Sequence, residues 1–183
     1  SNLGSYKYKY SQDWDKFKDT PWDDPVDTSL SLKEIQSLSE RFTTVPENFK
    51  LHRVVDKLVE QRKQMGVGKI PIDWGMAEIL AYASLVTQGA PVRITGEDSG
   101  RGTFAHRHAV FHDQNPPGSN QREYITLQHL SKDQAPFAIY DSVLNEEAVL
   151  AYEYGYACAS PTSLTIWEAQ FGDFSNGAQT AID

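Results

Sequence analysis

The chain has 183 residues, 39% hydrophobic and 23% charged, a composition that suits a soluble globular domain with its own core and excludes wholesale disorder. With 25 Asp and Glu residues against 17 Lys and Arg, its net charge of −8 argues against a nucleic-acid-binding protein and against binding to an anionic membrane surface. No apolar run approaches the roughly 18 residues that span a bilayer, and the single cysteine, Cys158, cannot form an internal disulfide, which favours a reducing compartment.

Residues 1–30 have the composition of an extended lead-in or linker. Tyrosines alternate with lysines near the start, and Pro21 and Pro25 then lie among aspartates, a pattern typical of irregular structure. The scattered aromatic residues favour packing against a neighbouring surface. Residues 1–5 carry neither an initiator methionine nor a signal pattern and are typical of a cloning remnant, so we expect a truncated chain.

Two amphipathic helices are predicted within residues 31–70, which we expect to form a helical connector. The first, over residues 31–42, begins with a capping box in which Ser31 and Glu34 each satisfy a free backbone N–H. The second covers residues 52–65, and its charged face indicates only contact with solvent.

Strands and helices alternate after residue 71. A helix over residues 74–88, capped by Asp73, is rich in alanine and leucine and carries few charges, so we expect it to be buried on more than one side. The other predicted elements are a helix over 146–159, a weak strand near 124–127, and strands over 92–95, 137–141 and 163–169. This order predicts an α/β fold with a partial parallel sheet flanked by helices. An unfinished helix over residues 174–183 again suggests a truncated domain.

The densest polar cluster runs from Gly96 to Asp113. Gly100, His106, His108 and Asp113 have the spacing of the first cupin motif, with Asp where cupins use Glu, and a strand-borne His-x-His could hold a divalent metal. Cupins are all-β proteins, however, and this motif lies between helical segments. A polar loop with hydrogen-bonded histidines is therefore the favoured interpretation, and no metal site is predicted.

A second cluster places Glu146 and Glu147 in the first turn of a helix, directly after a strand. The simpler interpretation is stabilisation of the helix dipole, worth about 0.3–1 kcal/mol. The alternative is a general acid or base at the carboxyl edge of a parallel sheet, where ligands of α/β proteins bind. Spacing alone leaves both open.

A third cluster, residues 167–174, joins a strand end to the following turn. Phe171 and Phe174 can pack into a core. They can also form a stacking wall for a flat heteroaromatic ring, with Gln170 hydrogen-bonded to a ring substituent. These alternatives also remain open on the pattern alone.

Together these clusters resemble the decarboxylating component of 2-oxoglutarate dehydrogenase. The matching stretches are residues 73–78, 96–108, 126–130, 153–156 and 164–179. The resemblance covers about residues 26–183 and is most specific over residues 167–174. Ser99 and Ala105 stand where the family more often has Val and Ser. The resemblance implies a transketolase-like pyrimidine-binding domain whose N-terminal part is residues 71–183.

In such a family, thiamine diphosphate and Mg²⁺ are bound between two subunits of a homodimer. One subunit would contribute the diphosphate and Mg²⁺ ligands, and the other the pyrimidine side. The resemblance assigns this chain to the pyrimidine side only. We therefore expect no bound cofactor and no activity from the chain alone.

The resemblance also assigns site residues. Glu146 matches the glutamate that hydrogen-bonds the ring nitrogen of the aminopyrimidine, and Glu147 takes that place if the register is off by one. Gln170 and Phe174 match positions that contact and stack on the pyrimidine, with Phe171 beside them. A carboxyl group at the ring nitrogen stabilises the imino tautomer that removes the C2 proton, and burial favours its protonated form.

By the same resemblance, His106 and His108 lie in a nearby loop and belong to the active-site architecture. The implied reaction is oxidative decarboxylation of 2-oxoglutarate, with the succinyl group passed to the lipoyl arm of dihydrolipoyl succinyltransferase. The alternatives are a 2-oxoadipate dehydrogenase component, a cupin-like metal protein and a noncatalytic interaction module. The expected location is the bacterial cytoplasm, or the mitochondrial matrix in a eukaryote.

Overall fold

The structure is a computed structural model that describes residues 12–19, 21, 23–115 and 123–183. None of the helices in these ranges is both long and apolar enough to cross a bilayer. The helices are α1 (Leu32–Phe42), α2 (Arg53–Gly66), α3 (Trp74–Thr87), α4 (Glu146–Ala159) and α5 (Gln179–Ile182). The strands are β1 (Val92–Gly96), β2 (Val110–His112), β3 (Glu123–Ile125), β4 (Phe137–Asp141) and β5 (Leu164–Glu168). Short 3-10 turns are η2 (Asp15–Phe17), η3 (Thr126–Gln128) and η4 (Asp173–Ser175).

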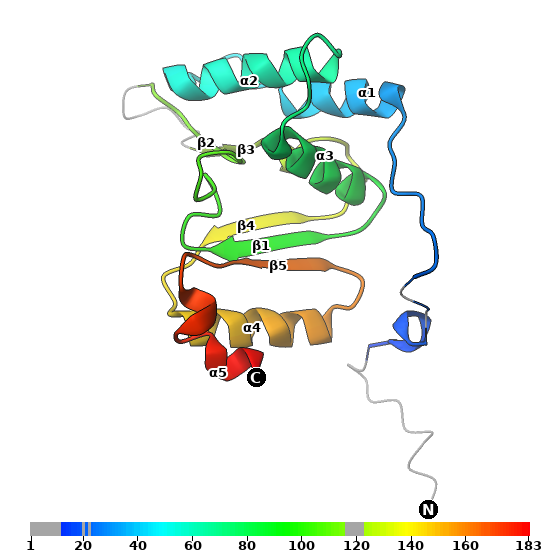
Figure 1. Cartoon of the computed structure of the whole chain (residues 1–183). Helices are drawn as coiled ribbons and strands as arrows, with labels where there is room; N and C mark the ends of the chain where they lie inside the picture. Colours follow the sequence, from blue (N-terminus) through cyan, green and yellow to red (C-terminus); the bar gives the residue numbers. More distant parts are fainter. Residues whose placement is uncertain (1–11, 20, 22, 116–122) are drawn as a thin grey trace, which may run out of the picture.

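The main sheet is parallel and has the strand order β4-β1-β5. In its register Ile94 of β1 lies between Ile139 of β4 and Ile166 of β5. Helices α1, α2 and α3 lie on one side of this sheet, and α4 and α5 lie on the other (Figure 1). The predicted α/β class, a parallel sheet flanked by helices, is confirmed.

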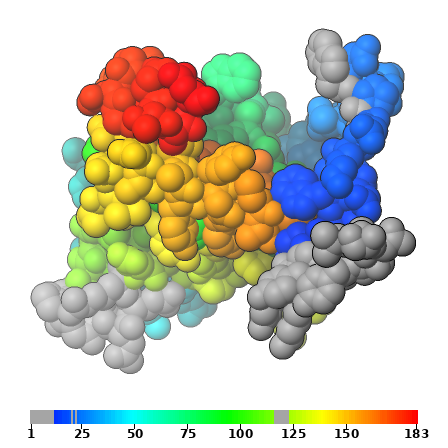
Figure 2. Space-filling view, turned by 90° about the horizontal axis from the view of Figure 1, so that it is seen from below, coloured from blue at the N-terminus to red at the C-terminus, as the bar shows by residue number. Residues whose placement is uncertain are grey.

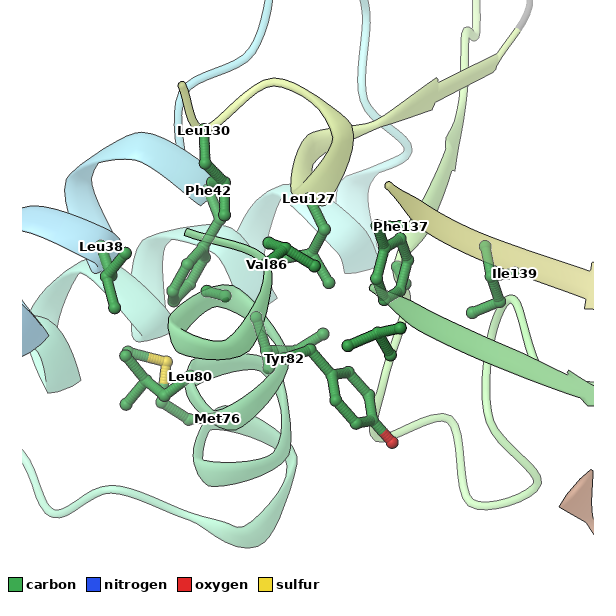
Figure 3. Close-up of a cluster of buried hydrophobic side chains, with 14 of the residues drawn as sticks. Leu38, Phe42, Met76, Leu80, Tyr82, Val86, Leu127, Leu130, Phe137 and Ile139 are labelled. Atoms are coloured by element: carbon green, nitrogen blue, oxygen red, sulfur yellow. The ribbon is translucent and has the colours of Figure 1, made fainter. Parts of the chain in front are cut away.

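The core lies between α3, α1 and the sheet. Figure 3 shows Met76 and Val86 of α3 among side chains from α1, from the η3 region and from β4. Met76 and Val86 have no exposed surface, and Phe42 of α1 retains 2%. The buried residues of α3, between Gly75 and Val86, fall on one broad face, whereas Ala81 on the opposite face is exposed, so the expected burial on more than one side is wrong.

The predicted helix starts are confirmed by their capping hydrogen bonds. Ser31 and Glu34 form the capping box of α1. The Asp73 side chain accepts a hydrogen bond of 2.7 Å from the backbone N–H of Met76 at the start of α3. Such caps satisfy backbone donors that have no partner within the helix.

Replacing Asp73 by Ala is expected to lower the free energy of unfolding by about 1 kcal/mol, because the first turn of α3 loses its capping acceptor. Urea unfolding of the purified chain measures this change. Asp73→Asn is the matched control, since it keeps a side-chain oxygen acceptor and should lose less than half as much. Equal losses in both variants would assign the effect to the charge of Asp73 rather than to the cap.

Two further expectations need correction, and one strand is additional. Strand β2 has only three residues and pairs with β3, where Phe111 lies opposite Tyr124. Strand β3 ends earlier than expected, because Thr126–Gln128 form a 3-10 turn. The expected continuous helix over 174–183 is wrong: η4 and α5 are separated at Asn176, whose backbone is not helical (φ −130°, ψ −124°).

In the described part of the lead-in, η2 lies near the carboxyl end of α4, and residues 23–30 then run along the edge of the molecule to α1 (Figure 1 and Figure 2). Trp14 donates its Nε1–H to the backbone oxygen of Cys158 at 3.2 Å. Trp14 thus contacts the end of α4, but Trp14 and Phe17 keep 39% and 44% of their surface exposed, so the expected packing of the lead-in aromatics is confirmed only as this contact. The tyrosine–lysine alternation at residues 6–10 lies outside the described residues.

Candidate active site

The three parallel strands end together, and the polar clusters of the sequence follow directly. Gly96 at the end of β1 pairs with Asp141 of β4 and with Glu168 of β5. A Cβ on Gly96 would lie 2.5 Å from the backbone oxygen of Glu168, so only glycine fits here. Asp141 accepts a 2.8 Å hydrogen bond from the backbone N–H of Gly100, which anchors the following loop to the same edge. Ligands of parallel α/β sheets bind at this edge.

One cavity at this edge, of about 280 Å³, is lined by Glu146. Asn145 caps α4 by accepting a 2.9 Å hydrogen bond from the backbone N–H of Ala148, which fixes the position of the first turn. Glu146 is half-buried, whereas Glu147 is exposed and does not line this cavity. The structure therefore distinguishes two neighbouring carboxylates that the sequence pattern treated alike.

The segment η4–α5 packs on the start of α4 (Figure 2). Gly177 lies so close to Glu146 that a Cβ there would be 3.0 Å from Glu146 Oε2. The break between η4 and α5 thus leaves room for the Glu146 carboxylate, and a regular helix with a larger residue here would displace it.

A second cavity, of about 360 Å³, contains the other three predicted site residues, Gln170, Phe171 and Phe174. Phe171 is 83% exposed and Phe174 is 57% exposed, so neither packs into the core. Phe104, from the loop after β1, meets Phe171 edge to ring with centroids 6.2 Å apart. Exposed aromatic rings beside an amide form a surface suited to a flat heteroaromatic ligand.

Glu168 lines both cavities and forms the wall between them. The structure thus brings Gln170, Phe171 and Phe174 into one cavity and places Glu146 in the adjoining one. Glu168 was not among the predicted site residues. Its position at the carboxyl end of a predicted strand could have indicated a site residue, since residues at the carboxyl ends of parallel strands commonly face ligands.

A buried arginine, Arg107, holds this wall in place. Its Nε donates to Glu78 Oε1 of α3 at 2.7 Å, and its Nη1 donates to the backbone oxygen of Ser99 at 2.8 Å and to Glu168 Oε2. The Arg107 side chain is only 5% exposed. No local sequence pattern indicates this role, because Arg107 joins partners from α3 and β5 that are distant along the chain.

The ionisation of this cluster follows from its contacts. Burial raises the pKa of Glu78, but hydrogen bonds from Arg107 and Tyr82 and the charge of Arg107 outweigh burial, so the pKa lies below its ordinary value. For Arg107, burial lowers the pKa, but contacts with Glu78 and Glu168 raise it above its ordinary value. Both groups are therefore charged at neutral pH.

His106 and His108 lie in the loop after β1, not on a strand. His106 Nε2 is 3.1 Å from Glu78 Oε2, and His108 has a left-handed backbone with φ 40°. Burial and the charges of Arg62 and Arg101 lower the pKa of His108, which keeps its imidazole neutral at pH 7. The strand-borne geometry of the cupin motif is absent from this loop. Among the described residues, no group of three His, Cys, Asp or Glu side chains could hold a metal ion.

A family model described as transketolase, pyrimidine binding domain, matches residues 70–183. The 2-oxoglutarate dehydrogenase E1 component of Cupriavidus necator is 55% identical over 181 residues, which are 99% of this chain and 19% of that protein. The 2-oxoglutarate dehydrogenase E1 component of Azotobacter vinelandii is 52% identical over 93% of this chain and 18% of its own length.

The same coverage recurs in a more distant relative. The protein named oxoglutarate dehydrogenase in Buchnera aphidicola is 46% identical over 85% of this chain and 16% of its own length. The chain thus spans about a fifth of the curated relatives it matches. Because the family model covers most of the chain, including both cavities, the chain belongs to the transketolase pyrimidine-binding domain family.

Proposed function

We propose that this chain is a segment of the decarboxylating component of a 2-oxoglutarate dehydrogenase. The whole enzyme would decarboxylate 2-oxoglutarate with thiamine diphosphate and pass the succinyl group to the lipoyl arm of dihydrolipoyl succinyltransferase. The observation that carries the proposal is the pairing of a half-buried carboxylate, Glu146, with an adjoining aromatic cavity containing Gln170 at the carboxyl edge of the sheet. The names of the relatives at about 50% identity support the substrate.

The side chains at this edge suit the aminopyrimidine of thiamine diphosphate. Glu146 would hold the proton shared with the ring nitrogen, Phe174 would stack on the ring face, and Gln170 would hydrogen-bond a ring substituent, with Phe171 at the rim. When bound, the cofactor supplies the nucleophilic C2 centre that decarboxylation of a 2-oxo acid requires. The contribution of this chain is to orient the ring and to hold a proton at Glu146.

The remaining parts of the proposal concern the assembly. We assign the diphosphate and Mg²⁺ ligands to other segments of a homodimeric parent, so the isolated chain is expected to be inactive. In this proposal residues 1–30 are a linker, residues 31–70 a connector and residues 71–183 part of the pyrimidine-binding domain. The family match over residues 70–183 supports the last of these. In a bacterium the enzyme would be cytoplasmic.

The full-length enzyme containing this segment is expected to prefer 2-oxoglutarate to 2-oxoadipate by about 10–200-fold in kcat/KM, the range for one extra methylene in a fitted site. The measurement is steady-state decarboxylation of each acid with thiamine diphosphate and Mg²⁺ supplied. Omitting thiamine diphosphate is the control and should abolish turnover. A preference for 2-oxoadipate would reassign the substrate, and turnover without thiamine diphosphate would contradict the proposed cofactor.

A further inference from the structure

Four side chains form a continuous hydrogen-bonded series along the wall between the two cavities. Arg107 Nη1 donates to Glu168 Oε2. Glu168 Oε1 accepts from Thr103, from its backbone N–H at 3.2 Å and from its hydroxyl at 3.4 Å. Thr103 Oγ1 in turn accepts from Gln170 Nε2 at 2.9 Å. This series connects a buried arginine to an amide in the candidate pyrimidine cavity.

The direction of each hydrogen bond follows from the chemistry of the first member. A guanidinium can only donate, so the Glu168 carboxylate facing Arg107 serves as an acceptor. The Thr103 hydroxyl must then give its only proton to Glu168 Oε1. Its oxygen is left with lone pairs, which can only accept, and so the group of Gln170 that faces Thr103 must be the NH₂ donor.

The orientation of the Gln170 amide is therefore fixed. With one Nε2 hydrogen given to Thr103, the carbonyl Oε1 is the acceptor that the amide has left for a ligand. No hydrogen bond among the described residues engages this oxygen. Gln170 lines the cavity that also contains Phe171 and Phe174. The amide thus has its carbonyl acceptor free beside the aromatic wall of this cavity.

We propose that Thr103 is a specificity-determining positioning residue: it orients the Gln170 carbonyl so that the cavity selects a ring carrying an amino group over one carrying an oxo group at the same position. This inference rests on the proposed function, in which the ring is the aminopyrimidine of thiamine diphosphate. An amino group donates to the Gln170 oxygen, whereas an oxo group would bring two acceptors together without a proton between them.

The position of Thr103 supports this role. Thr103 is half-buried and lies in the loop between Gly102, whose φ is 81°, and Phe104, which touches Phe171. A Cβ on Gly102 would lie 2.5 Å from His106 Cε1, so only glycine fits at this turn, which lies directly against the His106 ring. The hydroxyl of Thr103 is consequently held where it meets Glu168 and Gln170 together.

The test uses the full-length apoenzyme with Mg²⁺, titrated with thiamine diphosphate and with its analogue that carries a 4′-oxo in place of the 4′-amino group. Dissociation constants come from calorimetry or from tryptophan fluorescence, for which Trp167 in the adjoining cavity is a natural reporter. The wild-type enzyme is expected to bind the amino form more tightly. Thr103→Val keeps the shape of the side chain but loses the hydroxyl. In this variant the preference for the amino form is expected to fall about 10-fold, because the Gln170 amide can rotate and exchange the positions of its oxygen and nitrogen.

Thr103→Ser is the matched control, because it retains the hydroxyl and should retain the wild-type preference. A Thr103→Val enzyme with unchanged preference would overturn the inference while leaving the proposed function intact. Should Thr103→Val fail to fold, Gln170→Met, which has neither donor nor acceptor, is expected to lose the preference in the same way, and an unchanged ratio would again overturn it. Failure of the wild-type enzyme to bind either compound would instead contradict the proposed function.

Discussion

In the full-length enzyme, Glu146→Gln is expected to slow exchange of the C2 proton of bound thiamine diphosphate by about 10²–10⁴-fold, the usual contribution of a positioned acid–base group. Glu146 is the half-buried carboxylate of the smaller cavity, and an amide in its place can neither take up nor release the proton shared with the ring nitrogen. Acid-quenched hydrogen–deuterium exchange, followed by NMR of the released cofactor, measures this rate directly.

The neighbouring residue provides the control. Glu147 shares the first turn of α4 but is exposed and does not line the cavity, so Glu147→Gln should leave the exchange rate within about 3-fold of wild type. If Glu147→Gln slowed exchange and Glu146→Gln did not, the catalytic role would belong to Glu147. If both variants exchanged at the wild-type rate, neither glutamate would have that role.

Replacing Arg107 by Met is expected to lower the free energy of unfolding by about 2–4 kcal/mol. The substitution leaves the carboxylates of Glu78 and Glu168 without their guanidinium partner, and breaking a buried ion pair costs about 3–5 kcal/mol. The expected value is smaller because the two carboxylates retain 20% and 16% exposure and are partly screened by solvent. Urea unfolding of the full-length enzyme gives the difference.

A surface arginine in the same loop is the matched control. Arg101 pairs with Asp98 at 3.0 Å, and both side chains are close to half exposed. Arg101→Met should therefore change the free energy of unfolding by less than about 1 kcal/mol. Comparable losses in the two variants would contradict the assigned role of Arg107.

The effect of Arg107→Met should also depend on pH. The folded-state pKa of Glu78 lies below its ordinary value of 4.5, so its ion pair stabilises the fold above that pH and ceases to do so as the pH falls through the folded-state value. The difference between wild type and Arg107→Met should consequently be largest near neutral pH and shrink below pH 4.5. A difference that grows on acidification would contradict the assignment to Glu78.

The local elements of this protein follow from short stretches of its sequence. Asp73 and the pair Ser31 and Glu34 mark helix starts because a short oxygen-bearing side chain satisfies free N–H groups wherever the helix packs. The alternation of apolar strands and helices indicated the parallel α/β class, since parallel strands need a crossover of roughly a dozen or more residues, usually a helix such as α4 between β4 and β5. The same order determined that the clusters around Glu146 and Gln170 would both follow strand ends.

Which of the candidate residues meet depends on the three-dimensional fold. Nothing near Arg107 in the sequence indicates burial; its partners Glu78 and Glu168 are 29 and 61 residues away. The contact between Thr103 and Gln170 likewise joins positions 67 residues apart. Local propensity and hydrophobic periodicity act over a few turns of chain and carry no information on such pairings. The fold itself, by bringing three strand ends to one edge, built the wall between the two cavities and oriented the amide that lines one of them.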